Sequence, residues 1–121
     1  MKQGRKISGG KYKKFRKKKL YEKKGQERLV KLGKLKRKVL RARGGNEKIV
    51  LLASDEANVL DKNTNKAKKA KIKNVLETPS NKFLARQNIL LKGAIIETEL
   101  GKAKITNRPS QEGSVEAVLI E

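Results

Sequence analysis

Positive charge is concentrated at one end of this 121-residue chain. Residues 1–48 contain 21 Lys/Arg and three acidic residues, whereas residues 49–121 contain 12 Lys/Arg and nine acidic residues. Apolar residues are sparse between Met1 and Gly33, so this segment has no apolar face that could drive its folding. We therefore predict a basic, extended N-terminal arm over residues 1–33, disordered when free, and one folded domain over residues 34–121.

The net charge of +21 favours a polyanionic partner, because such a chain repels itself until its charge is neutralised. Nucleic acid is the partner we expect. The absence of Cys and His excludes disulfides, zinc sites built on thiolate or imidazole, and His-dependent bases. No converging set of catalytic groups is visible, so we predict a protein that is not an enzyme, with no metal, cofactor or small-molecule substrate.

The longest apolar run, residues 49–53, is too short to span a bilayer, and we expect a soluble, cytoplasmic protein without membrane contact. From Lys34 onward, short apolar runs alternate with turn-forming residues, a pattern typical of β-structure. Residues 61–65 form a turn cluster between strands predicted near 57–60 and 67–73. Because the strands are few, a small antiparallel β-barrel, closed or nearly closed, protects their edges better than a sandwich.

Two helical pieces are expected beside the strands. Thr78 and Pro79 have the form of an N-cap followed by an N1 proline, so residues 81–87 are predicted to form one short helix. A single helical turn is also predicted over residues 27–32, kept short by the glycines on either side.

Residues 94–106 alternate between apolar and polar, and predict a hairpin with residues 100–101 as its two-residue loop. In this register Glu97 and Glu99 each face a lysine across the hairpin. We interpret them as structural ion pairs, and not as catalytic carboxylates or a magnesium site, because no other acid–base group accompanies them.

The arm interleaves three aromatic residues, Tyr12, Phe15 and Tyr21, with Lys and Arg. This combination lets a flexible segment neutralise phosphates while its rings stack on exposed bases or sugars. The alternative is a solvated run of charge. RNA contact is favoured, because three of the four aromatic residues of the chain lie where no core can receive them.

Residues 41–48, Arg-Ala-Arg-Gly-Gly-Asn-Glu-Lys, are predicted to form the tip of a hairpin. Its two glycines can adopt positive φ and bring backbone amides close to a phosphate. We expect Arg41, Arg43 and Lys48 to lie close together. Repulsion between these like charges destabilises the tip unless a phosphate lies among them. An ordinary exposed turn is the alternative.

Several stretches taken together carry a family resemblance. They are Arg5 to Gly10 followed by Arg16 to Lys18, then Arg41 to Lys48, Pro79 to Asn81 with Arg86 and Asn88, and Lys92 to Glu99. With them the sequence resembles small-subunit ribosomal protein eight of archaea and eukaryotes, the e type, over nearly the whole chain. Ser8 replaces the usual Thr, and Glu22 to Gly25 shifts the ending of the N-terminal signature. The compact length favours an archaeal member.

The resemblance implies a ribosome-bound structural constituent of the small subunit that binds ribosomal RNA and supports subunit assembly and translation. It implies small-subunit ribosomal RNA and neighbouring small-subunit ribosomal proteins as partners. Charge alone leaves a chromosome-coating DNA-binding protein as the alternative. The residues that we predict to contact RNA are Lys2, Arg5, Lys6, Ser8, Gly9, Gly10, Lys11, Tyr12, Lys13, Lys14, Phe15, Arg16, Lys17, Lys18, Lys19, Tyr21, Lys36, Arg37, Arg41, Arg43, Gly44, Gly45, Asn46, Lys48, Asn81, Lys82, Arg86, Asn88 and Lys92.

Overall fold

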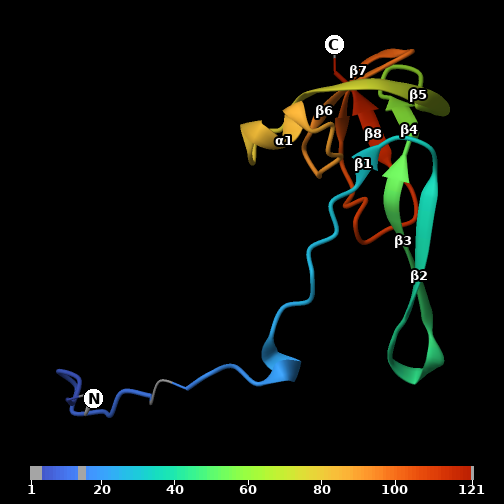
Figure 1. The fold of residues 1–121 in the computed structure, drawn as a ribbon. Coiled ribbons are helices and arrows are strands. Elements are labelled where there is room, and N and C mark those ends of the chain that lie inside the picture. The colour runs from blue at the N-terminus through green and yellow to red at the C-terminus, as the bar shows by residue number, and fades with distance from the viewer. Residues whose placement is uncertain (1–3, 14–15, 121) are drawn as a thin grey trace.

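The computed structural model describes residues 4–13 and 16–120. Eight strands carry the fold, and Figure 1 shows a β-domain from which the N-terminal segment and one long hairpin project. The elements are η1 (Leu20–Glu22), β1 (Lys31–Leu32), β2 (Lys36–Arg41), η2 (Arg43–Gly45), β3 (Glu47–Ser54), β4 (Glu56–Asp61), β5 (Lys66–Glu77), α1 (Lys82–Arg86), β6 (Ile95–Thr98), β7 (Gly101–Ile105) and β8 (Glu116–Leu119).

Strands β4 to β8 form a closed five-stranded barrel in chain order, which confirms the predicted fold class. Consecutive strands pair antiparallel, and β8 returns to pair parallel with β4. One parallel pair is unavoidable, because an odd number of strands cannot alternate direction all the way around a ring. The interior is narrow and takes small aliphatic residues, such as Ala57 opposite Ala70 and Ile96 opposite Ala103.

A second sheet, in the order β1-β3-β2, stands beside the barrel. The β2–β3 hairpin is therefore outside the barrel, and Figure 1 shows its tip projecting away from it. Leu51 of β3 is fully buried and joins the barrel core, so the two sheets share one apolar cluster.

Buried packing of the chain begins at residues 30–32. Val30 is fully buried, and its carbonyl accepts a hydrogen bond from the Leu90 amide at 2.8 Å. The Leu32 amide donates to the Asn88 carbonyl at 2.9 Å, and β1 pairs in parallel with the end of β3. The helical turn predicted over 27–32 is wrong, because partners on both sides take the backbone groups that a helix would use internally.

Every described residue from 4 to 29 is exposed, so buried packing begins at Val30, within the segment predicted as the arm. Figure 1 shows residues 4–13 and 16–29 running away from the barrel. In the parts of the chain that the structure describes, no helix has both the length and the apolar character to cross a membrane.

The predicted helix is present as α1, but its N-cap is Asn81 and not Thr78. The Asn81 side chain accepts a hydrogen bond from the Phe83 amide at 3.1 Å. Thr78 is buried three residues earlier, and its hydroxyl donates to the Asn81 carbonyl. The Asn81 amide donates back to the Thr78 carbonyl at 3.0 Å. Thr-Pro-Ser therefore forms a turn ahead of the helix.

The β6–β7 hairpin is confirmed, but its register differs from the predicted one. Thr98 pairs with Gly101, so the loop is residues 99–100. The Thr98 hydroxyl donates to the Gly101 carbonyl at 2.8 Å and accepts from the Leu100 amide at 3.3 Å. Gly101 is the first residue of the returning strand. Its φ of +124° is disfavoured for residues with a side chain, which explains why glycine occupies this position.

The two hairpin carboxylates are not ion-paired as predicted. Glu97 does face a lysine, Lys102, across the hairpin. However, the one ion pair within 4.0 Å among residues 4–13 and 16–120 involves neither Glu97 nor Glu99. Both positions are on the outside of the barrel, where water screens the attraction and side-chain entropy opposes a fixed pair.

The turn cluster at 61–65 connects β4 to β5 as predicted, with Asp61 opposite Lys66. The Asp61 carboxylate accepts from the Asn63 amide at 2.9 Å and from the Thr64 hydroxyl at 2.8 Å. These bonds lower the pKa of Asp61, that from the Thr64 hydroxyl most and that from the Asn63 amide next. The turn is thus closed by an ionised carboxylate.

Candidate nucleic-acid interface

The first described residues fold back on themselves in a small loop. Arg5 and Lys11 form an antiparallel bridge, and the Lys6 amide donates to the Gly10 carbonyl at 2.9 Å. The Arg5 guanidinium donates to the Gly9 carbonyl at 3.0 Å. Gly9 has φ of +77°, a conformation in which a side chain would be strained. Ser8 lies in this loop and is exposed, and so are Lys11 and Lys13 beyond it.

Two aromatic rings of the arm each lie under a lysine. The Lys6 ammonium is 5.7 Å from the centroid of the Tyr12 ring, and that of Lys19 is 5.7 Å from the Tyr21 centroid. Tyr12 is 50% and Tyr21 78% exposed. A ring covered on one face by a cation can still stack on a base through its other face. The predicted contacts at Lys2, Lys14 and Phe15 lie outside the described residues.

Arg16 differs from its basic neighbours because it already has an anionic partner. Its guanidinium donates two hydrogen bonds to the Glu22 carboxylate, at 2.6 and 2.7 Å. The Lys19 amide also donates to Glu22, at 3.0 Å, so the carboxylate closes the turn η1. The Arg16 guanidinium, and after it the Lys19 amide, lowers the pKa of Glu22. The hydrogen bonds to Glu22 in turn raise the pKa of Arg16. A phosphate that binds Arg16 must therefore compete with Glu22, whereas exposed Lys17 and Lys18 carry no such partner among the described residues.

The predicted hairpin tip is confirmed between β2 and β3. Gly44 and Gly45 have φ of +70° and +78°, which explains why glycines occupy the turn. The Ala42 amide donates to the Asn46 carbonyl at 2.6 Å, and the Asn46 side chain donates to the Arg43 carbonyl at 3.2 Å. The tip is thus a closed, exposed turn that carries Arg43.

The expected crowding of Arg41, Arg43 and Lys48 at this tip is wrong. Arg41 pairs with Glu47, while Lys48 pairs with Leu40. Successive side chains of a strand point to opposite faces, so Arg41 and Lys48 lie on opposite faces of the hairpin. The exposed cations therefore line both faces, and Lys36 and Arg37 are exposed nearer to the barrel.

The two predicted asparagine contacts near α1 have structural roles. Asn81 caps the helix, as described above. Asn88 ends it with φ of +52°, a left-handed conformation that Asn tolerates, and its side chain accepts from the Val75 amide at 3.4 Å. Their presence in the sequence is thus explained by backbone geometry.

Exposed cations do surround α1, at Lys82, Arg86 and Lys92. Phe83 is adjacent to Lys82 and is 72% exposed. Phe83 is not among the residues that the sequence predicts to contact RNA. The sequence does place this aromatic residue next to Lys82 and three residues before Arg86, in a helix that is too short to bury it.

The structure therefore distributes the predicted contacts over separate segments. Figure 1 shows the arm and the β2–β3 hairpin leaving the β-domain as two projections, with α1 on the barrel's flank. Within residues 4–13 and 16–120, no three His, Cys, Asp or Glu side chains are grouped so that they could hold a metal ion. The arrangement defines a class of protein, a small aliphatic barrel with basic projections.

The family model described as ribosomal protein S8e matches residues 1–120, and the chain belongs to this family. A Methanococcus aeolicus protein named small ribosomal subunit protein eS8 is 48% identical over 119 residues, which cover 96% of this chain and 91% of the relative. The protein of that name from Nanoarchaeum equitans is 47% identical over 115 residues, 95% of this chain and 91% of the relative. The one from Ignicoccus hospitalis is 59% identical over 86 residues, 71% of this chain and 66% of the relative.

Proposed function

We propose that this protein is a structural constituent of the small ribosomal subunit that binds ribosomal RNA and has no enzymatic role. Membership of the S8e family supports the ribosomal assignment, and relatives named as small-subunit proteins favour it over the chromosome-coating alternative. Its partners are small-subunit ribosomal RNA and neighbouring ribosomal proteins, and it resides on the ribosome in the cytoplasm.

The arm binds the RNA, and the barrel holds the arm in position. The observation that carries this division is that every described residue from 4 to 29 is exposed, while the packed core begins at Val30. The arm makes mainly phosphate and 2′-OH contacts, with Tyr12 and Tyr21 stacking on exposed bases or sugars. The barrel fixes the point from which the arm enters the RNA, and the β2–β3 tip adds a second contact.

A truncation placed by the structure tests this proposal. Removing residues 1–27 deletes 12 Lys/Arg but keeps Arg28, which donates to the Ser110 carbonyl at 3.4 Å, and the buried Val30. If about half of these cations contact phosphates, the slope of log affinity against log salt falls by about 4–5. The probe is deproteinised small-subunit ribosomal RNA of Methanococcus aeolicus, with fragmented chromosomal DNA for comparison.

The truncated protein is expected to keep its unfolding midpoint, which shows that the domain is intact. The full chain is expected to bind the ribosomal RNA in preference to the DNA and to co-sediment with small subunits at moderate salt. An unchanged slope after truncation contradicts the role of the arm, and a preference for DNA contradicts the ribosomal assignment.

A further inference from the structure

We propose that the outer face of β5 forms a further binding surface for the RNA backbone, distinct from the arm and the hairpin tip. We call Lys69, Lys71 and Lys73 the β5 lysine face. This inference rests on the proposed function and adds the barrel wall to the interface.

The charge of the domain is unevenly divided. Residues 62–73 contain six lysines and no acidic residue. The rest of the span 49–121 contains six basic and nine acidic residues. The net charge of +3 over residues 49–121 therefore conceals one strongly basic segment beside a remainder with a net charge of −3, a distribution that attracts a polyanion to one side.

The lysines of β5 alternate with core residues. Ala70 and Ile72 are 4% and 7% exposed and point into the barrel, so the lysine face points outward, and all three of its members are exposed. Alternate residues of a strand repeat about every 6.6 Å, which sets the ammonium groups in a row. In the described part of the chain, none of the three lies within 4.0 Å of a carboxylate oxygen.

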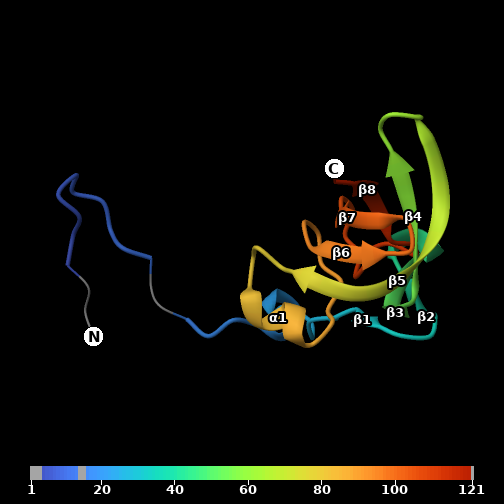
Figure 2. The same cartoon turned by 90° about the horizontal axis from the view of Figure 1, so that it is seen from above.

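Figure 2 shows β5 as a long curved strand that runs from the β4–β5 loop across the barrel toward α1. The lysine face thus follows a continuous path along the barrel. Such a path suits the sugar-phosphate backbone of RNA, which presents one negative charge per nucleotide.

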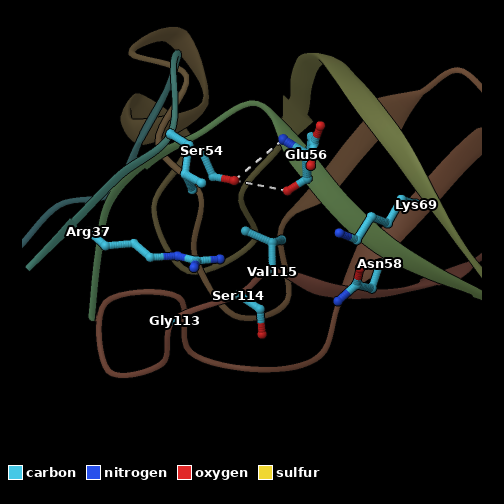
Figure 3. A pocket seen from close by; sticks show the side chains of 9 residues that line it. Arg37, Ser54, Glu56, Asn58, Lys69, Gly113, Ser114 and Val115 are labelled. Atoms are coloured by element: carbon cyan, nitrogen blue, oxygen red, sulfur yellow. Dashed lines mark hydrogen bonds between the residues drawn. The ribbon is translucent and has the colours of Figure 1, made fainter. Parts of the chain in front are cut away.

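A cleft at the junction of the two sheets marks one end of this path. It has a volume of about 100 Å³, and Arg37 of β2 and Lys69 of β5 both line it. Figure 3 shows the two basic side chains reaching into the cleft from opposite sides. A cavity needs about 10–15 Å³ to hold one water molecule, so this cleft has room for several polar atoms, such as the oxygens of a phosphate group.

Two cations and one carboxylate line the cleft, and the carboxylate of Glu116 lies beside it. Glu56 is the one carboxylate that lines it, against Arg37 and Lys69. Nearby Glu116 accepts hydrogen bonds from the Asn58 side chain at 2.9 Å and the Ser114 hydroxyl at 2.7 Å, which hold its carboxylate.

Protection of a strand edge is the simpler explanation for lysines in β5. Part of this strand is unpaired on one side, since β6 joins it only from Ile72 onward, and lysines on such an edge hinder aggregation. That explanation covers Lys66, Lys68, Lys69 and Lys71, which all precede Ile72. It does not cover Lys73, which lies beyond the unpaired part, at the irregularity between the paired residues Ile72 and Asn74. Nor does it explain why Arg37, from another sheet, lines the same cleft as Lys69.

The test compares two triple variants of the full chain that remove the same charge. One is Lys69→Gln/Lys71→Gln/Lys73→Gln. The matched control is Lys102→Gln/Lys104→Gln/Arg108→Gln, whose positions are also exposed but lie in β7 and after it, outside the basic segment 62–73. Both are measured for unfolding midpoint and for binding to deproteinised small-subunit ribosomal RNA of Methanococcus aeolicus between 50 and 200 mM salt.

Each lost phosphate contact lowers the salt slope by about 0.7–0.9, so the β5 variant is expected to lose about 2.1–2.7. Over this fourfold change in salt, its affinity should therefore fall about 20- to 40-fold less than that of the unaltered chain. The control should keep the full slope, and both variants should unfold at the original midpoint.

Three results overturn the inference. Equal loss of slope in both variants means that only total charge matters. If the β5 variant keeps the steep salt slope of the unaltered chain, the β5 lysine face does not bind RNA, but the proposed function still stands. An unchanged slope with weakened association to neighbouring ribosomal proteins assigns β5 to a protein contact. By contrast, a full chain that prefers DNA to ribosomal RNA refutes the proposed function itself.

Discussion

The position at which the arm joins the domain can be tested with one methyl-scale substitution, Val30→Ala. Val30 is fully buried and belongs to the core cluster with Leu51 and Leu90. Ile→Val, which removes one buried carbon, costs about 0.5–1.5 kcal/mol, so the two carbons lost in Val→Ala should cost about 1–3 kcal/mol. For a domain of this size, that lowers the unfolding midpoint by roughly 4–24 °C.

Leu29→Ala is the matched control, because Leu29 precedes Val30 directly and is 41% exposed. Its effect on the free energy of unfolding should stay within about 0.5 kcal/mol. Far-UV circular dichroism is the suitable signal, since the chain has no Trp and both Tyr lie in the arm. Neither substitution removes charge, so the salt slope of RNA binding should be the same in both.

Equal midpoints for the two variants would refute the reasoning. Residues 30–32 would then belong with the arm, as the sequence predicts, and their pairing with β3 and with residues 88–90 would contribute little to stability. A large loss at Val30 alone places the start of the folded domain four residues before the predicted start at Lys34.

Three further outcomes are expected. Asn81→Ala removes the cap of α1 and should lower stability by about 0.5–2 kcal/mol, whereas Asn81→Asp should restore most of it, as thermal unfolding would reveal. Gly44→Ala should cost about 1–2 kcal/mol through its positive φ, and its unfolding midpoint should not fall if the tip does not require that conformation. In an NMR titration the pKa of Glu22 should lie below 4.5 and rise toward that value in Arg16→Gln. Because the pKa is lowered, the ion pair's contribution is present above the ordinary pKa and is lost as the pH falls through the lowered one.

Local chemistry made several elements predictable. Asp61 and the residues after it close their turn through side-chain bonds to adjacent backbone, and Gly44 and Gly45 supply the positive φ that the hairpin tip requires. Alternation of apolar and polar residues was enough to place the strands β6 and β7, because each strand buries one face.

Other details depended on competing local partners. Thr78 and Asn81 are both good caps, and burial of the Thr78 hydroxyl against the Asn81 carbonyl decides in favour of Asn81. Thr98 similarly selects the β6–β7 register, because its hydroxyl bonds across the turn to Gly101. Pattern alone ranks these choices equally, since each uses a common turn or cap.

By itself, the sequence determined the uneven charge, the mainly β domain and the basic hairpin tip, since these depend on composition and on residues near in the chain. Tertiary structure alone decided that Val30 belongs to the core, that β8 closes the barrel in parallel with β4, and that Arg37 and Lys69 line the same cleft. Each of these joins segments far apart in sequence. Such contacts follow from how the sheets close and pack, which local preferences of the backbone do not specify.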